Sequence, residues 1–130
     1  MNEVSNKKRG CLFCGIQEKD IIEENELAIA IKDNYPVTKF HTLVIPKRHV
    51  EDYFDLSKDE IRACNILLKY MRDDILKDDP SVEGFNIGVN SGAVAGQTVF
   101  HCHIHLIPRR LGDVDNPRGG VRNVRFPQPS

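Results

Sequence analysis

The stretch that decides the fold of this chain is Gln-Thr-Val-Phe-His-Cys-His-Ile-His-Leu-Ile-Pro, residues 97–108. Three of the five histidines, His101, His103 and His105, stand there at every second position. Side chains of a β-strand alternate between its two faces, so a strand would project all three imidazoles from one side. A helix would send them in three different directions. The apolar residues between the histidines, with Pro108 after them, favour a strand that ends at the proline.

The length and composition of the chain predict one domain with one hydrophobic core. The chain has 130 residues, of which 40% are hydrophobic and 28% are charged. Lys and Arg total 18 against 19 for Asp and Glu, so we expect no binding to nucleic acid. The polar, basic segment 1–9 is not followed by an apolar run, and no stretch reaches transmembrane length. These features predict a cytoplasmic protein without a signal peptide or a membrane contact.

The remaining segments show strand and helix patterns. Alternating apolar residues predict a β-hairpin within residues 21–33, whose alanines would leave room for a flat ligand, and strands at 40–45 and 84–90. Ser57 and Glu60 have the spacing of a capping box, and apolar residues follow at helical spacing. The sequence therefore predicts one helix from Ser57 to about Leu76, with its apolar stripe in the core.

The four cysteines fall into two classes. In a chain without a secretory signal, the pair Cys11-x-x-Cys14 indicates metal binding or redox chemistry, whereas Cys64 and Cys102 are expected to be small buried residues. Same-face Cα atoms of a strand lie about 6.7 Å apart, so three alternating histidines can hardly share one metal. The residues favour a structural Cys₂His₂ zinc site, built from the cysteine pair, one histidine at an end of the row and one further ligand, for which His49 is the remaining candidate.

His103, at the centre of the row, is then the candidate nucleophile. A neutral imidazole has a nucleophilic nitrogen near physiological pH and can form a covalent phosphoryl intermediate. A second imidazole beside it would stabilise the negative charge that develops on phosphate oxygens. The glycine-rich loop 91–96, followed by Gln97 and Thr98, offers further donors to an anion.

These residues resemble the signature of the histidine triad (HIT) family, His-φ-His-φ-His-φ-φ, where φ is hydrophobic. Residues 41–49, Asp33 and Asn90 also match, and the similarity covers residues 11–110. The resemblance implies an α+β fold, with an antiparallel sheet of about five strands, one long helix and a short helix. It further implies a homodimer with a continuous sheet. We expect a flexible segment 1–10 before this domain and a C-terminal arm, 111–130, after it.

The resemblance also implies a nucleotidyl hydrolase or transferase. His103 would attack an α-phosphorus to give a nucleotidyl-histidine, which water then cleaves. The substrate would be a purine nucleotide derivative, either a dinucleoside polyphosphate such as diadenosine tetraphosphate or a nucleoside phosphoramidate. Family positions that contact phosphate correspond to His41, Gly96, Gln97, Thr98, His103 and His105.

Two further features follow from the same resemblance. Asp33 matches a family contact to ribose, and Asn90 matches a position that lines the same cleft. In the zinc-bearing members, which include bacterial hydrolases of diadenosine tetraphosphate, the metal is structural. The zinc ligands of those members correspond to Cys11, Cys14, His49 and His101.

Two other functions are compatible with these residues. A purine-nucleotide-binding regulatory protein with low turnover would need the cleft but not a competent His103. A zinc-centred scaffold would need only the metal site. The intact histidine row favours the enzyme. In the arm, Arg118, Arg122 and Arg125 are expected to hold polyphosphate over an active site, of this subunit or of its partner.

Overall fold

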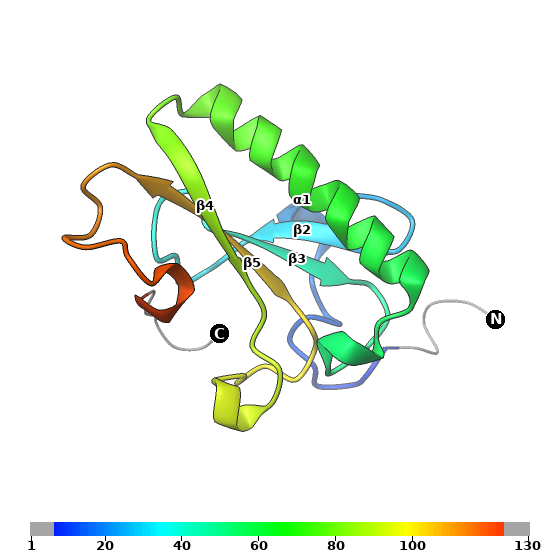
Figure 1. Ribbon diagram of the computed structural model, residues 1–130. Helices are drawn as coiled ribbons and strands as arrows, with labels where there is room; N and C mark the ends of the chain where they lie inside the picture. The colour runs from blue at the N-terminus through cyan, green and yellow to red at the C-terminus, as the bar shows by residue number, and fades with distance from the viewer. Residues whose placement is uncertain (1–6, 124–130) are drawn as a thin grey trace.

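The fold is a five-stranded antiparallel sheet with one long helix across one of its faces (Figure 1). The computed structural model describes residues 7–123. Along the sheet the strands have the order β1-β2-β3-β5-β4, which confirms the predicted fold class. Within the described residues, no helix is long and apolar enough to cross a membrane. The bounds of the elements are Ile21–Glu24 (β1), Ala28–Lys32 (β2), Thr42–Pro46 (β3), Lys58–Asp78 (α1), Val82–Gly88 (β4) and Ile104–Arg110 (β5).

Four short 3₁₀ turns are described besides α1, where the sequence predicted one short helix. Their bounds are Glu18–Asp20 (η2), Tyr53–Asp55 (η3), Ala93–Ala95 (η4) and Gly120–Asn123 (η5).

Helix α1 begins where the sequence predicted it. The Ser57 hydroxyl accepts the N–H of Glu60, and the Glu60 carboxylate accepts the N–H of Ser57, so the capping box is complete. Cys64, Leu67 and Met71 follow at helical spacing and are buried against the sheet. Burial of an apolar side chain of this size contributes roughly 1.5–3 kcal/mol, so the stripe holds α1 on the sheet.

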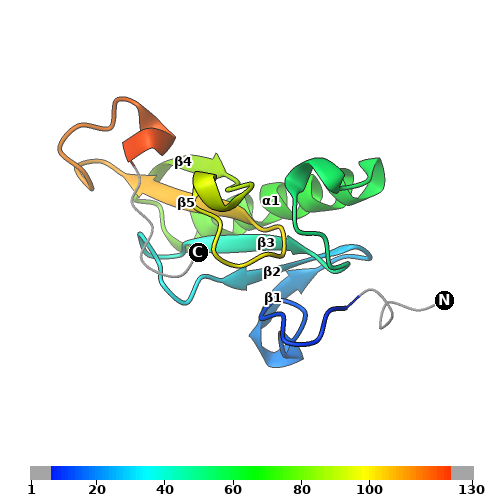
Figure 2. The same cartoon turned by 90° about the horizontal axis from the view of Figure 1, so that it is seen from below.

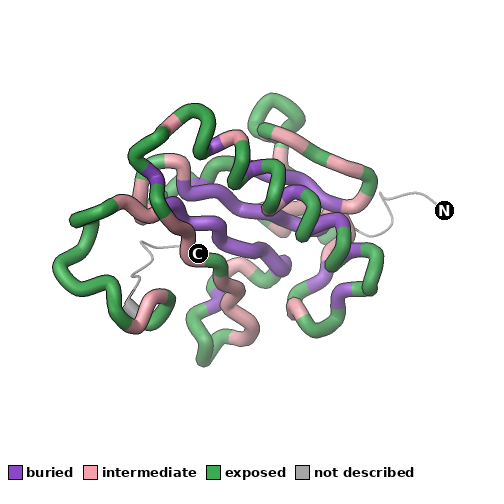
Figure 3. Tube along the Cα trace, turned by 45° about the horizontal axis from the view of Figure 1, so that its top comes forward, coloured by how far each residue is buried: buried purple, intermediate pink, exposed green. Residues whose placement is uncertain are grey.

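The two faces of the sheet bury different residues. Ala28 and Ala30 of β2 lie in the core beneath α1, while Ile29 and Ile31 lie on the opposite face. The predicted space for a flat ligand beside the alanines is therefore wrong. Their small side chains instead let the helix approach the sheet, and Figure 3 shows the central strands buried beneath it. The opposite face is covered in part by the N-terminal segment that carries Phe13.

Strand β5 begins later than predicted. His101 and His103 lie in the chain before it, and only His105 lies in the strand itself. Pro46, the last residue of β3, gives the reason. It has no N–H, and its carbonyl accepts the ring Nε2–H of His101 at 2.8 Å, so the β3–β5 ladder cannot continue past Ile104.

Strand β5 also ends later than predicted, because Pro108 does not interrupt it. Beyond Leu106, β5 pairs only with β4, so the side of Pro108 that lacks an N–H faces no strand. On that side the Pro108 carbonyl accepts the hydroxyl of Thr38 at 2.7 Å. The predicted alternation of faces is nevertheless confirmed, since Ile104 and Leu106 lie in the core beneath α1.

The arm that follows β5 returns to β4 (Figure 2). Turn η5 contacts this strand, and a β-carbon added at Gly88 would lie only 3.7 Å from Val121 Cγ1. Gly88 is paired with His105, so the arm contacts the strand next to the histidine row. Arg118 and Arg122 are exposed, and Arg125 lies outside the described residues. Polyphosphate binding by these arginines stays a prediction.

The ion pair between Glu60 and Arg48 connects α1 to the end of β3. Glu60 is 4% exposed, and its carboxylate accepts Nε and Nη2 of Arg48 at 2.8 and 2.7 Å. The hydrogen bonds from Arg48 hold the pKa of Glu60 below its usual range. We predict that Glu60→Gln lowers the free energy of unfolding by about 2 kcal/mol at neutral pH, because the amide cannot accept both guanidinium donors.

The pH dependence of this effect has a defined sign. Because the folded-state pKa of Glu60 is depressed, the stability that the pair contributes is present above the unfolded pKa and is lost as pH falls through the folded pKa. Urea unfolding at neutral pH and at a pH about one unit below the ordinary glutamate pKa should show the wild-type advantage shrinking in acid. Glu83→Gln, at an exposed position of β4, is the matched control. An advantage that does not change with pH contradicts the prediction.

Candidate active site and metal centre

The three alternating histidines, His101, His103 and His105 (the histidine row), lie on the sheet face opposite α1. They belong to two clusters of side chains. The pairing of His105 with Leu43, an apolar residue of that face, places the row there. The first cluster consists of Cys11, Cys14, His49 and His101. The second cluster consists of Asp33, His41, His103 and His105.

The first cluster has the dimensions of a tetrahedral metal site. His101 Nδ1 lies 3.4 Å from Cys11 Sγ and 3.5 Å from Cys14 Sγ, and His49 Nδ1 lies 3.3 Å from Cys14 Sγ. All four ligand atoms lie within 4.8 Å of one another. A tetrahedral zinc with Zn–N and Zn–S bonds of ordinary length separates its ligand atoms by about 3.5 Å. The four residues that the sequence predicted as metal ligands are therefore brought together.

The hydrogen bonds around this cluster also select suitable tautomers. His101 donates its Nε2–H to the Pro46 carbonyl, which leaves the lone pair of Nδ1 directed toward the sulfurs. His49 presents Nδ1 to Cys14, and its Nε2 lies 3.7 Å from the Glu51 carboxylate. The His101 ring thus offers a lone pair on the side of the cysteines and carries its proton on the far side, and the His49 ring turns Nδ1 to the same cysteines. This is the donor set that a Cys₂His₂ metal site requires.

His103 has one nitrogen committed and one free. Its Nδ1–H donates to the carbonyl oxygen of His101 at 2.8 Å, so the lone pair resides on Nε2. This Nε2 is buried and has no hydrogen-bond partner among residues 7–123. Burial lowers the pKa of His103, so the ring is neutral near pH 7. An oriented, neutral imidazole with a free lone pair has the properties of a nucleophile.

A chain of hydrogen bonds assigns the protons of the neighbouring rings. The backbone N–H of Val37 donates to His41 Nδ1 at 3.0 Å, so the proton of His41 is on Nε2. His41 Nε2 lies 2.9 Å from His105 Nδ1 and therefore donates to it. His105 in turn carries its own proton on Nε2. Burial, reinforced by His103 and His41, lowers the pKa of His105 to about 3, so it is a neutral N–H donor beside His103.

The same argument rules out a second metal site in this cluster. Asp33, His41 and His105 lie close enough together to be three metal ligands. However, the Val37 N–H occupies the lone pair of His41 Nδ1, so His41 Nε2 must carry the proton and cannot bind a cation. The three side chains form a hydrogen-bonded group instead.

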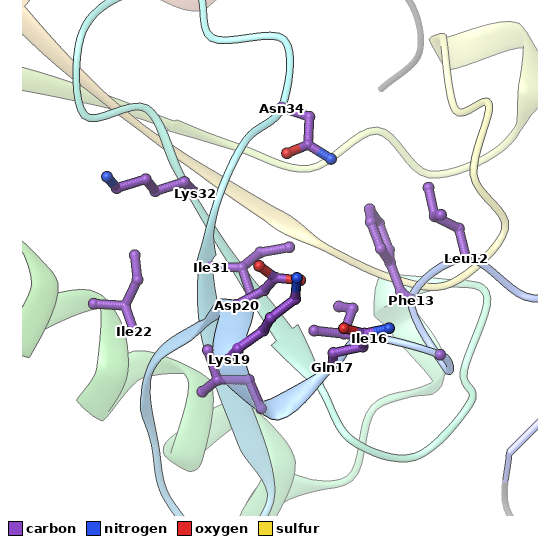
Figure 4. Close-up of a pocket in the computed structure, with 12 residues that line it drawn as sticks. Leu12, Phe13, Ile16, Gln17, Lys19, Asp20, Ile22, Ile31, Lys32 and Asn34 are labelled. Atoms are coloured by element: carbon purple, nitrogen blue, oxygen red, sulfur yellow. The ribbon is translucent and has the colours of Figure 1, made fainter.

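A pocket of about 660 Å³ adjoins this cluster (Figure 4). It shares Phe13, Ile31 and Asn34 with a smaller cleft that His103 and Asp33 line. Figure 4 shows Phe13 and Ile31 on its walls, and the Phe13 ring lies edge-on to the His103 ring, with centroids 5.0 Å apart. A flat, partly apolar ligand in this pocket would have its polar end close to His103.

Gln97 lies in the site region, but its side chain holds the preceding loop together. Its Oε1 accepts the N–H of Gly92 at 2.8 Å, and its Nε2 donates to the carbonyls of Glu51 and Val99 at 2.9 and 3.2 Å. The residue is 4% exposed. Its predicted contact with phosphate stays a prediction, and its observed role is to shape the loop.

The other predicted loop residues are placed differently. Gly96 has a φ of 101°, in the left-handed region that favours glycine, and a β-carbon there would lie 3.7 Å from Asn90 Nδ2. Asn90 and Gly96 are thus adjacent, as predicted for one cleft. Thr98 is exposed and lines a separate pocket together with Cys11 and His49. The predicted contact of Thr98 with phosphate stays a prediction.

Several residues of the site were not predicted. Phe13 contacts both His101 and His103, and its place between Cys11 and Cys14 is the signal that could have identified it. Val37 and Pro46 act through backbone groups, which leave no side-chain signature. Phe40, directly before His41, has a φ of 73°, which is unusual for a bulky residue. No sequence pattern indicates that conformation.

The fold and the two clusters define a class of protein, in which an antiparallel sheet carries a row of buried imidazoles beside a cysteine–histidine cluster. Comparison with known proteins shows which family has these features. The HIT domain model matches residues 15–112. An uncharacterized HIT-like protein of Mycoplasma genitalium is 42% identical over 108 residues, which cover 80% of this chain and 76% of that protein. Adenylylsulfatase HINT3 of Arabidopsis thaliana is 33% identical, over 85% of this chain and 58% of that protein.

Solved structures show the same relationship. A Zn-bound histidine triad family protein from Mycobacterium smegmatis has a TM-score of 0.72 and 37% identity, over 80% of this chain and 78% of that chain. The diadenosine triphosphate hydrolase of Plasmodium falciparum, in complex with cyclomarin A, has a TM-score of 0.71 and 29% identity, over 78% of this chain and 68% of that chain. The chain belongs to the HIT family.

Proposed function

We propose that this protein is a nucleotidyl hydrolase or transferase in which His103 Nε2 attacks the α-phosphorus of a nucleotide. One observation carries the proposal. The lone pair of His103 Nε2 is buried, is oriented by the Nδ1–H bond to the His101 carbonyl, and has no hydrogen-bond partner among residues 7–123. A buried polar atom without a partner is uncommon in proteins unless a ligand or a reaction uses it.

The proposed reaction has two steps. First, the N–P bond to His103 forms while the bond from phosphorus to the leaving oxygen or nitrogen breaks, and the leaving group takes that electron pair. Water then attacks the same phosphorus and loses a proton to the solvent, which balances the proton that the leaving group takes up. The N–P bond breaks, and His103 regains its lone pair. The Nε2–H of His105 is a donor for the phosphoryl oxygens, whose negative charge increases at each transition state.

The pocket favours a nucleoside as the rest of the substrate. Phe13 and Ile31 offer apolar surface to a base, and Asp33 and Asn34 offer polar groups to sugar hydroxyls. Relatives named as an adenylylsulfatase and a diadenosine triphosphate hydrolase support the class of reaction. Dinucleoside polyphosphates and nucleoside phosphoramidates both contain the attacked group, and we propose this pair of substrate classes.

We further propose that the cysteine–histidine cluster holds one structural zinc. The donor set, its spacing and the tautomer of His101 suit zinc, and a relative of known structure is zinc-bound. Four protein ligands leave no position for a catalytic water. Bound there, zinc would fix the loop that carries Phe13 and the backbone that orients His103, without taking part in the reaction.

The edge of the sheet suggests that two copies pair. β4 is an edge strand, and Ile87 is 54% exposed beside a groove that Leu68 and Phe85 also line. An edge strand with apolar neighbours is a template for pairing with another strand. Antiparallel pairing of β4 with β4 of a second copy would extend the sheet across a two-fold axis, so we propose a homodimer.

The role of His103 predicts the behaviour of two variants. His103→Ala and His103→Asn should lower kcat by several orders of magnitude, because the covalent pathway is lost, while nucleotide binding persists. Acid quenching of the wild type with labelled substrate should trap labelled protein, and neither variant should become labelled. A regulatory nucleotide-binding protein would instead show binding without turnover in the wild type. Labelling of His103→Ala would move the assignment to His105.

The zinc proposal predicts about one zinc per chain by metal analysis of the purified protein. Cys14→Ser should lose both the metal and thermal stability, because three ligands bind zinc more weakly and the loop loses its anchor. Cys64→Ser, at a buried cysteine in the core beneath α1, is the control and should keep the metal. Metal-free wild-type protein with an unchanged melting temperature after chelation contradicts this proposal.

The dimer proposal predicts that Ile87→Glu forms monomers, because a charge in the proposed interface would be buried without a partner. Phe54→Glu, at a residue that is 82% exposed in η3, should leave the mass of the assembly unchanged. Light scattering behind size-exclusion chromatography measures both. A wild type that is monomeric at all concentrations is the contrary result.

A further inference from the structure

Asp33 lies against the two hydrogen-bonded histidines as well as against the cleft. Its Oδ1 accepts the backbone N–H of Tyr35 at 2.8 Å. Its Oδ2 lies 3.4 Å from His41 Nε2 and 3.8 Å from His105 Nδ1, the two atoms of the N–H···N bond. The residue is 7% exposed, and Oδ2 has no hydrogen-bond partner within the described part of the chain.

A buried carboxylate oxygen in this position requires an explanation. Burial of an ionised carboxylate is unfavourable unless positive charge or an N–H donor lies close by. The nearest donor is the Nε2–H of His41. Its nitrogen lies 2.9 Å from His105 Nδ1, to which it donates, and 3.4 Å from Asp33 Oδ2. The carboxylate therefore acts on the orientation of the Nε2–H of His41.

We propose that Asp33 is a positioning residue for the His41–His105 pair, in addition to its predicted contact with ribose. Its Oδ2 keeps the proton of His41 on Nε2, so that His105 Nδ1 stays an acceptor and His105 Nε2–H stays a donor. Its negative charge also lies in the same cleft as His103, whose ring becomes positively charged when Nε2 bonds to phosphorus while Nδ1 keeps its proton. The proposal rests on the proposed function, in which His105 acts on the phosphoryl group.

Asp33→Asn tests this role without a change of shape. Oδ1 is needed by the Tyr35 N–H, so the amide nitrogen of the variant must face the two rings. An NH₂ group there would donate to His105 Nδ1 and compete with His41, whose own N–H would meet another donor. The isosteric substitution should therefore break the His41–His105 hydrogen bond.

The kinetic experiment separates this role from a contact with ribose. Wild type and Asp33→Asn are compared on adenosine 5′-phosphoramidate and on its 2′,3′-dideoxy analogue, which has no hydroxyls for Asp33 to bind. We expect kcat to fall by about 10- to 100-fold on both substrates, which corresponds to the loss of one charge-assisted interaction. Asp59→Asn, whose side chain is 77% exposed on α1, is the control for loss of charge. A variant with wild-type kcat on the dideoxy substrate overturns the proposal.

A second measurement needs no turnover. In ¹⁵N spectra of the imidazoles of the full chain, the wild type should show a scalar coupling between His41 Nε2 and His105 Nδ1 across the N–H···N bond. Asp33→Asn should lose it, and its retention overturns the positioning role. A wild type that has no activity but shows the coupling, together with its loss in Asp33→Asn, would contradict the proposed function and leave the positioning role supported. If Asp33→Asn does not fold, Asp33→Ser, which also removes the carboxylate beside the rings, is measured instead and should lower kcat on both substrates.

Discussion

The hydrogen bond from His101 Nε2–H to the Pro46 carbonyl is the interaction on which both clusters depend. It ends the β3–β5 ladder, so that the chain before Ile104 is free of the sheet. It leaves His101 Nδ1 directed to the cysteines, and it holds the backbone whose carbonyl orients His103. His101 of the cysteine–histidine cluster and His103 of the second cluster can therefore lie two residues apart while their free nitrogens face different clusters. In an uninterrupted strand the side chains of all three histidines would point the same way from fixed positions.

The imidazoles are buried on one face of the sheet, which would be unfavourable if their nitrogens had no hydrogen-bond partners. Four histidines of the two clusters are at most 2% exposed, and burial lowers the pKa of each of them. Neutral imidazoles each have one donor and one acceptor, so a directed chain of hydrogen bonds can satisfy them in a buried site. The Val37 N–H begins the chain through His41 to His105, and backbone carbonyls separately accept the N–H groups of His101 and His103, so each ring has a defined tautomer. The lone pair of His103 Nε2 is left without a hydrogen-bond partner among residues 7–123.

The two faces of the sheet carry different kinds of side chain. The face beneath α1 is filled by apolar side chains, and the capping box and the Glu60–Arg48 pair hold the helix in place. The other face carries the imidazoles and the loop of Phe13, with a pocket beside them. Alternation along β5 assigns each residue to one of these layers: Ile104 and Leu106 pack beneath α1, while His105 faces the site. The rigid apolar layer gives the polar layer a fixed geometry, which catalysis by orientation requires.

The sequence by itself predicted the class of fold, the row of three histidines and the cysteine pair, and its resemblance to the HIT family indicated the other members of both clusters. Period-two alternation, helical spacing with a capping box and a cysteine pair are patterns among residues close in sequence. Such patterns can be recognised without knowledge of the fold. Only the tertiary structure decided where β5 begins, because that depends on the carbonyl of Pro46, 58 residues before Ile104 in the chain. It also decided the proton positions, since the Val37 N–H sets the tautomer of His41 through the backbone. Backbone groups have the same chemistry at almost every residue, so no sequence pattern can show which of them a side chain will meet.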